Sequence, residues 1–392
     1  MRRQAKGPGT GWSVGAGGAG AILASAALAL LFAGAAAAQS VPEDARSEVH
    51  PGDAKMYIGT YTSILVIDEA TSMVEDEIRL RNGIPRSMIL SADQERFYVL
   101  NTMYEDIEVI DIASRESIDE FRLSSGNRKV RIWGYNIDPQ DRYAILLAKT
   151  YTRLPDRFEV SDPLLLRYDL ESRTVTDTIP WPAGEPEERA RMIFSPDGAL
   201  LYFFADEILV FETDGFTEVD RWAYEEALGQ GIGRFEFGFP DQAYEEPGYY
   251  TGLFRITDPV QNRRLMGIAR VNLSERDVEF STLGPSESVS FVVAPGGQRA
   301  YGLQQQVGNY QFWTFDLDNG QVVQREQFRG RPRMSLMPSS NGRVLYVYNA
   351  GNTIDLHDAS TYRHLLTIDL DVDSSTGLFI LPPSGMRAAA SP

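Results

Sequence analysis

The sequence predicts an all-β fold: a seven-bladed β-propeller of four-stranded blades. The first of three supporting observations is a pattern that recurs seven times, in which a β run ends in Asp or a similar residue, a turn follows, and a second β run begins. The marked residues are Asp68, Asp111, Asp169, Glu212, Asn272, Asp316 and Asp358. Their spacing of about 42 to 60 residues matches the period of propeller blades with two insertions.

The second observation is a turn rich in Ser, Pro, Asp and Gly that leads into a strand with an aromatic end. Residues 195–198 (SPDG) precede Leu201-Tyr202, and residues 294–297 (APGG) precede Ala300-Tyr301. Gly and Asn adopt the positive φ of such turns, and Pro sets the entry angle. The flanking runs are β-branched and aromatic, as in half-buried strands. Only residues 185–191 and 223–229 are expected to be briefly helical.

The third observation concerns the two ends of the repeat. Four strands per blade follow from the pattern, for example 87–90, 97–100, 107–111 and 117–123. No inner strand precedes Tyr57 in the first blade, whereas a spare β run, 377–382, follows the last outer strand. We expect this C-terminal run to become the innermost strand of the first blade, because closing the ring removes its exposed edges.

The N-terminus is typical of an export signal. Arg2, Arg3 and Lys6 precede an apolar run, 20–38, that ends in small residues, so we expect residues 1–38 to be a signal peptide cleaved before Gln39. The alternative is an uncleaved anchor, since the run is nearly long enough to span a bilayer. The Sec and twin-arginine routes stay open. Cleavage would give a periplasmic or secreted protein without a membrane-inserted segment. Its expected parts are a linker at 39–55, a single propeller at 56–384 and a flexible tail at 385–392.

Charge and cysteine content exclude several classes of function. The chain carries a net charge of −18, and loss of the three basic residues of the leader makes the remainder more negative still. Such a surface repels nucleic acid and anionic membrane, and attracts cations or basic protein patches. Solubility explains the charge equally well. The absence of Cys excludes disulfides, thiolate metal sites, c-type haem attachment and a thiol nucleophile.

Two insertions interrupt the repeat, at about 150–163 and 235–259. Loops displayed on a stiff scaffold commonly carry binding function. The second insertion is rich in acids and aromatic residues, among them Tyr249 and Tyr250, and aromatic side chains are favoured at protein interfaces. We therefore take Tyr249 and Tyr250 as candidate partner-contacting residues. An ordinary blade with a long irregular loop is the alternative.

Candidate catalytic and metal sites are weak. The three histidines, His50, His357 and His364, lack evident convergent partners for a metal. Residues 369–373 place three Asp at alternate positions, which would share one face of a strand; calcium binding and a solvated acidic edge both fit. No nucleophile elbow or phosphate-binding loop occurs. We expect no catalytic residue and no metal in this chain.

Several stretches resemble the β subunit of quinohemoprotein amine dehydrogenase. They are residues 98–107 (YVLNTMYEDI), 150–160 (TYTRLPDRFEV), 249–251 (YYT) and 373–380 (DSSTGLFI). The resemblance covers essentially the whole mature chain, mainly as repeat register, and much of it is shared with other periplasmic propellers of the YVTN type. The chain departs from that family in its alanine-rich leader and between Glu212 and Gly248.

The resemblance implies a seven-bladed subunit that binds no cofactor itself. A small companion subunit would carry a tryptophan-derived quinone, a further subunit would carry haem, and the propeller would help to form the pocket for oxidative deamination of primary amines. Asn101, Tyr104, Arg153 and Phe158 would lie on the partner-facing side. Two alternatives differ in class: a stand-alone YVTN-type lactonase, and a generic periplasmic protein-binding propeller with an unrelated partner.

Overall fold

The computed structural model describes residues 50–205, 207–223, 235–237, 246–258, 262–330, 333–348 and 351–382. The chain divides into two units, 1–41 and 42–392, and all described residues belong to the second. The expected signal peptide, residues 39–49 of the expected linker, the tail at 385–392 and nearly all of the expected helix at 223–229 lie outside the described residues.

No helix occurs in the described part of the chain, and hence none there that is long and apolar enough to cross a membrane. The helix expected at 185–191 is therefore wrong. This segment is an irregular connection between two blades, and Pro180, Pro182 and Pro186 explain why, since proline removes a backbone donor and disfavours helix in the residue before it.

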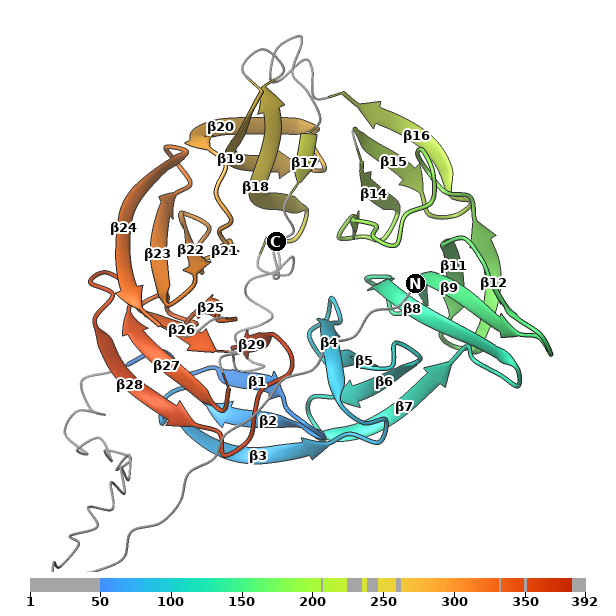
Figure 1. The fold of residues 1–392 in the computed structure, drawn as a ribbon, viewed down its shortest axis with the longest axis horizontal. Helices are drawn as coiled ribbons and strands as arrows, with labels where there is room; N and C mark the ends of the chain where they lie inside the picture. Colours follow the sequence, from blue (N-terminus) through green and yellow to red (C-terminus); the bar gives the residue numbers. More distant parts are fainter. Residues whose placement is uncertain are drawn as a thin grey trace, which may run out of the picture. The chain divides into compact units, whose positions relative to one another are not determined.

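The described strands form seven antiparallel sheets arranged as a propeller, as predicted (Figure 1). From its innermost to its outermost strand, blade 1 contains β29 (Leu378–Leu381), β1 (Lys55–Gly59), β2 (Ser63–Asp68) and β3 (Met73–Arg79). In the same direction, blade 2 contains β4 (Pro85–Leu90), β5 (Arg96–Asn101), β6 (Asp106–Asp111) and β7 (Glu116–Arg122). Blade 3 contains β8 (Arg128–Ile137), β9 (Tyr143–Arg153), β11 (Leu164–Asp169) and β12 (Thr174–Ile179), with β10 (Phe158–Val160) added beside β9.

The remaining four blades follow the same order. Blade 4 contains β13 (Met192–Phe194), β14 (Leu200–Phe204), β15 (Ile208–Glu212) and β16 (Thr217–Trp222). Blade 5 contains β17 (Phe235–Phe237), β18 (Tyr249–Asp258), β19 (Arg263–Asn272) and β20 (Asp277–Pro285). Blade 6 contains β21 (Val292–Val293), β22 (Arg299–Gln306), β23 (Asn309–Asp316) and β24 (Gln321–Arg329). Blade 7 contains β25 (Ser335–Pro338), β26 (Val344–Tyr348), β27 (Thr353–Asp358) and β28 (His364–Asp369).

Blade 3 differs from the predicted four-stranded plan because the first insertion forms a fifth, short strand. Val160 of β10 pairs with Tyr151, and Leu164 of β11 pairs with Ala148, so β10 and β11 follow one another along the same edge of β9. The extra strand therefore lengthens the blade and does not widen it.

The seven repeated acidic or amide residues each end the third strand of a blade. In the turn after them, the carboxylate or amide oxygen usually accepts a backbone hydrogen bond, as when Asp111 Oδ1 accepts from Ser114 N at 2.6 Å and Asp358 Oδ1 from Thr361 N at 2.8 Å. Four residues further on, the backbone is left-handed in every blade. These positions are Ser72, Arg115, Arg173, Phe216, Arg276, Gly320 and Tyr362. The repeat thus encodes one turn geometry seven times.

The ring closes as predicted, because β29 pairs with β1 and places Leu381 opposite Lys55. A buried carboxylate holds the other side of the same junction. Glu69 Oε1 accepts hydrogen bonds from Ser340 N at 2.9 Å and Tyr346 Oη at 3.1 Å, and Oε2 accepts from Ala54 N at 2.9 Å and Ser340 Oγ at 2.5 Å. Burial raises the pKa of Glu69, and these hydrogen bonds oppose the shift. Glu69 therefore joins blade 1, blade 7 and the segment before β1.

The two ends of the ring carry different connections. We call the upper face the end that carries the links between second and third strands, among them residues 60–62, 102–105, 154–163 and 307–308. The lower face carries the turns between first and second strands, among them residues 91–95, 138–142 and 195–199. Since strands alternate in direction, a residue at the end of a second strand lies on the upper face and one at its beginning lies on the lower face.

Candidate functional site on the upper face of blades 2 and 3

Asn101, the last residue of β5, holds the turn 102–105 on the upper face. Its side-chain Oδ1 accepts from Glu105 N at 3.2 Å, and its backbone oxygen accepts from Tyr104 N at 3.0 Å. Its Nδ2 donates to Asp106 Oδ2 at 2.7 Å and to the backbone oxygen of Asn82 at 3.2 Å. Asn101 is itself buried, so its role is to fix the turn that displays Tyr104.

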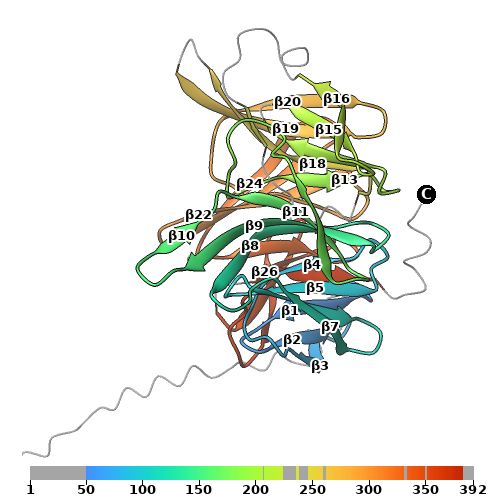
Figure 2. The same ribbon diagram turned by 90° about the vertical axis from the view of Figure 1, so that its right-hand side faces the viewer.

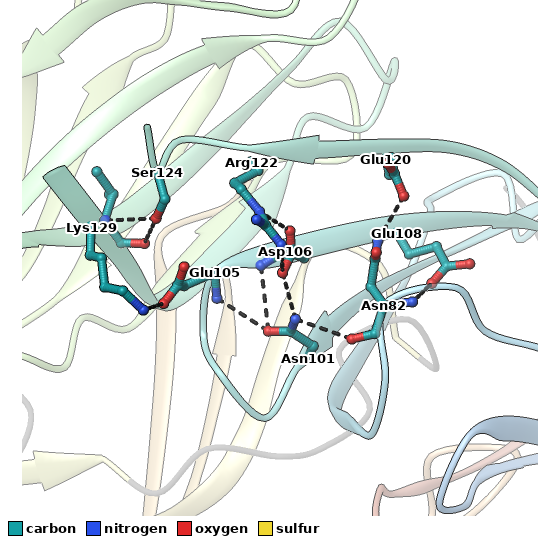
Figure 3. Close-up of polar contacts among 10 residues, drawn as sticks. Asn82, Asn101, Glu105, Asp106, Glu108, Glu120, Arg122, Ser124 and Lys129 are labelled. Carbon is teal, nitrogen blue, oxygen red and sulfur yellow. Dashed lines mark hydrogen bonds and ion pairs between the residues drawn. The ribbon is translucent and has the colours of Figure 1, made fainter. Parts of the chain in front are cut away.

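Buried acids connect this turn to the links on either side, as Figure 3 shows. Asp106 binds the Arg122 guanidinium with both oxygens, and this ion pair raises the pKa of Arg122. Glu105 pairs with Lys129 Nζ at 3.0 Å. Glu108 is almost fully buried and accepts from Asn82 N at 3.2 Å. Breaking any of these pairs would leave a buried carboxylate without its partner, which is costly. The network therefore favours a single arrangement of this turn.

The ring of Tyr104 contacts a cation and an indole ring. The Arg86 guanidinium carbon lies 4.5 Å from the centroid of the tyrosine ring, and the Trp133 ring centroid lies 4.8 Å away at an interplanar angle of 44°. The backbone of Tyr104 is left-handed (φ 63°), and its carbonyl accepts from Ile132 N at 2.7 Å. Non-glycine residues adopt this conformation mainly in tight turns, as in the repeated turns described above. The indole Nε1 of Trp133 is buried, with no hydrogen-bond partner among the described residues.

Arg153 and Phe158 lie further out on the upper face, where β9 and β10 project from blade 3 (Figure 2). They are opposite one another in the β9–β10 ladder. Phe158 is 66% exposed, and Arg153 is exposed as well. The structure therefore brings four of the six candidate residues, Asn101, Tyr104, Arg153 and Phe158, to one face of neighbouring blades.

The other two candidates lie elsewhere. Tyr249 begins β18 and therefore lies on the lower face, where it is 37% exposed. Tyr250 is fully buried, with its ring 5.0 Å from that of Phe204 and 4.9 Å from that of Phe237. Tyr250 belongs to the core between blades 4 and 5, and a strand alternates its side chains between two faces, so neighbouring tyrosines have separate surroundings.

Exposed large apolar side chains gather on the upper face. Those on its turns and on β10 are Tyr61, Met103, Phe158, Val160 and Val307. The lower face carries Met73 and Tyr249, and the others lie on outermost strands. Exposed apolar groups on one end of a rigid scaffold are a feature of protein-binding surfaces.

The remaining sequence candidates do not form a site. His357 is buried, and its Nδ1 donates to the Tyr362 carbonyl at 3.0 Å; burial lowers its pKa. Strand β28 ends at Asp369, and the backbone of Asp371 is left-handed. The expectation that the three Asp of residues 369–373 share one face of a strand is therefore wrong. No group of three or more His, Cys, Asp or Glu that could hold a metal occurs in the described ranges.

Sequence reasoning missed Arg86 and Trp133, which flank Tyr104 from two other strands. Trp133 is the additional residue where the β8–β9 register shifts between Ile132 and Gly134. The residue pattern does not reveal this register shift. A single tryptophan in an inner strand was the one signal in the sequence that could have pointed to Trp133.

Comparison with known proteins supports the fold alone. No protein-family model matches the chain, and no curated protein matches it. A functionally unknown protein from Desulfotomaculum acetoxidans DSM 771 aligns with a TM-score of 0.52 and 14% identity, over 85% of this chain and 100% of that one. Hydrazine synthase from Kuenenia stuttgartiensis aligns with a TM-score of 0.47 and 13% identity, over 80% of this chain and 90% of that one. Dihydro-heme d1 dehydrogenase NirN aligns with a TM-score of 0.49 and 11% identity, over 86% of this chain and 76% of that one. The first of these alignments, with a TM-score above 0.5, shows a likeness in fold, and an identity this low does not transfer function.

Proposed function

We propose that this chain is a non-catalytic propeller subunit that binds a partner protein through the upper face of blades 2 and 3. The observation that carries the proposal is the display of Tyr104: a half-buried ring that contacts Arg86 and Trp133, in a turn whose backbone N–H groups donate hydrogen bonds to Asn101. A rigid aromatic side chain beside arginine loses little entropy on binding and is the kind of group that dominates protein interfaces.

The identity of the partner follows from the family that the sequence resembles. The proposed complex is amine dehydrogenase-like and periplasmic, with a small subunit carrying a tryptophan-derived quinone and a further subunit carrying haem. The propeller would position the quinone-bearing subunit and form part of the pocket for oxidative deamination of primary amines. Its own chemical contribution would be binding and orientation, and the reaction would take place on the partner's cofactor.

Capture of the complex tests this proposal. The full chain, tagged and expressed in its native host, is purified at low and high salt and analysed by mass spectrometry and by a redox-cycling stain for quinones. We expect a small quinone-positive chain to co-purify with the wild type and to be reduced at least about tenfold by Tyr104→Ala, because the central aromatic contact is lost. Tyr249→Ala on the lower face is the matched control and should leave capture unchanged.

Three results would count against all or part of the proposal. Recovery of the wild type as a single chain at every salt concentration would exclude a stable complex. Equal loss of capture in Tyr104→Ala and Tyr249→Ala would exclude the upper face as the binding surface. Capture of a quinone-negative partner that depends on Tyr104 would replace the amine dehydrogenase-like complex with a generic binding propeller.

A further inference from the structure

The upper end of blade 3 extends as a three-stranded arm, formed by residues 128–131 of β8, residues 149–153 of β9, and β10. Residues directly opposite each other in an antiparallel ladder point to the same face of the sheet. Lys129 pairs with Tyr151, which pairs with Val160; Arg131 pairs with Lys149; and Arg153 pairs with Phe158. Since residues 149, 151 and 153 alternate along β9, all these side chains share one face.

This face, which we call the cationic face of the arm, carries four positive charges and no carboxylate. Its polar and aromatic members are Lys129, Arg131, Lys149, Tyr151, Arg153 and Phe158. The opposite face carries one cation and one anion, Arg128 and Glu159, with Val130 and two threonines. In a chain of net charge −18, this face is a local excess of positive charge.

Two of the four cations have no ion-pair partner within the described part of the chain. Lys129 pairs with Glu105, and Lys149 pairs with Glu188 at 2.6 Å. In contrast, Arg131 lies over the ring of Tyr151, 5.5 Å from its centroid, and neither Arg131 nor Arg153 lies within ion-pair distance of a described carboxylate. Two exposed apolar side chains, Phe158 at 66% and Val160 at 52%, lie on the same face of the arm, on the β10 side of β9, whereas the half-buried Arg131 lies on the β8 side.

We propose that the cationic face of the arm binds an acidic segment of the partner protein. Carboxylates of that segment would pair with the guanidinium groups of Arg131 and Arg153, where bidentate hydrogen bonds are available, and apolar side chains between them would cover Phe158 and Val160. The proposal rests on the proposed function for the existence of a partner, and it adds the chemistry by which the partner is recognised.

The test replaces Arg by Glu at three positions, so every variant changes the net charge of the chain by the same amount. Binding of the full chain to a fluorescent ten-residue peptide of alternating Glu and Leu is measured by anisotropy, between about 50 and about 500 mM NaCl. We expect Arg131→Glu and Arg153→Glu each to weaken binding at least about tenfold, and wild-type binding to weaken with salt. Arg128→Glu, on the opposite face of the same arm, is the matched control and should change affinity less than about threefold. Thermal unfolding of each variant checks that the fold is retained.

The outcomes separate this proposal from the proposed function. Equal weakening by all three variants, or no peptide binding by the wild type, overturns the arm proposal. Binding to phosphatidylserine vesicles in preference to the peptide, with the same ranking of variants, would also overturn it, since the face would then recognise a membrane. Partner capture that is lost in Tyr104→Ala but retained in Arg153→Glu contradicts the arm proposal and leaves the proposed function standing.

Discussion

The turns after the third strands, on the lower face, and the links between second and third strands, on the upper face, differ in how closely they repeat from blade to blade. On the lower face, the turns after the third strands share one backbone geometry, with a left-handed residue four positions after the marked residue in all seven blades. On the upper face, the links range from the two-residue turn 307–308 to the arm of blade 3, and the exposed apolar side chains of the turns gather there.

This difference separates residues that maintain the ring from residues available for binding. Repeated turns keep one geometry because every blade must present the same edges to its neighbours. Links that depart from the repeat cost the ring little, so they are free to carry specific contacts. Changes in the turns after the third strands and at the junction of blades 7 and 1 should therefore alter stability, whereas changes in the links on the upper face should alter binding.

Removal of β29 should produce the largest loss of stability. Truncation after Thr376 removes Leu378, Phe379, Ile380 and Leu381, all of them buried, and exposes the edge of β1. Burial of four such side chains contributes about 6 kcal/mol or more, comparable to the whole stability of many domains. Urea unfolding followed by circular dichroism should show the loss. An unchanged unfolding midpoint would contradict the role of β29 in closing the ring.

Glu69→Ala should have the next largest effect, because it leaves the backbone N–H of Ala54 and of Ser340 without their buried acceptor. We expect the unfolding free energy to fall by about 3 kcal/mol. Partner capture under native conditions should be retained, since Glu69 belongs to the junction with blade 7 and makes no contact with the turn that displays Tyr104. If Glu69→Ala lost partner capture while its unfolding free energy stayed unchanged, the assignment of stability to the junction and of binding to the upper face would be wrong.

The same residue predicts a pH dependence with a definite sign. Burial raises the pKa of Glu69 above its ordinary value of 4.5, so the folded chain binds a proton more tightly than the unfolded chain does. The contribution of Glu69 to the unfolding free energy is complete below pH 4.5 and is lost as the pH rises through the folded pKa. The Tm of the wild type relative to Glu69→Gln should therefore be higher at low pH than at neutral pH. A relative Tm that increases with pH would show that the four hydrogen bonds outweigh burial.

A repeated turn should contribute less than the junction. Asp358 Oδ1 accepts from Ser360 N at 3.0 Å and from Thr361 N at 2.8 Å, and Asp358→Ala should lower the unfolding free energy by about 1 kcal/mol. Asp111→Ala should have a similar effect in blade 2, because Asp111 makes the same contact with Ser114. Guanidinium unfolding of both variants measures this. A much larger effect in one blade than in the other would show that the turns are not equivalent.

Phe158→Ser should have the smallest effect on stability, within about 0.5 kcal/mol, because the side chain is exposed. Its effect should instead be on binding, where loss of the apolar contact should weaken the affinity for the Glu-Leu peptide several-fold. Thermal unfolding and anisotropy of the same preparation measure the two quantities. A large fall in Tm with unchanged binding would reverse the roles assigned to the two faces.

The fold could be predicted because its determinants are local and repeated. The residues from Asp68 to Asp358 mark the same turn in each blade, and the surplus β run at the C-terminus matches the missing strand before Tyr57. The site could be predicted only in part. Asn101, Tyr104, Arg153 and Phe158 share the upper face, whereas Tyr250 is buried, since composition cannot tell which side of a strand a tyrosine occupies. Arg86 and Trp133 meet Tyr104 through contacts between different strands, which depend on register.

The junction of blades 7 and 1 also determines the order in which the molecule can be completed. Gly59 N donates to Thr376 Oγ1 across 317 residues of sequence, and β1 has no inner neighbour until β29 arrives. During synthesis, blade 1 is therefore the last blade to be completed, because the inner edge of β1 stays unpaired until β29 has been made. Contacts so distant in sequence make folding slow. The final step joins the earliest strand to the latest one, so a chain cut short before β29 lacks the pairing that closes the ring.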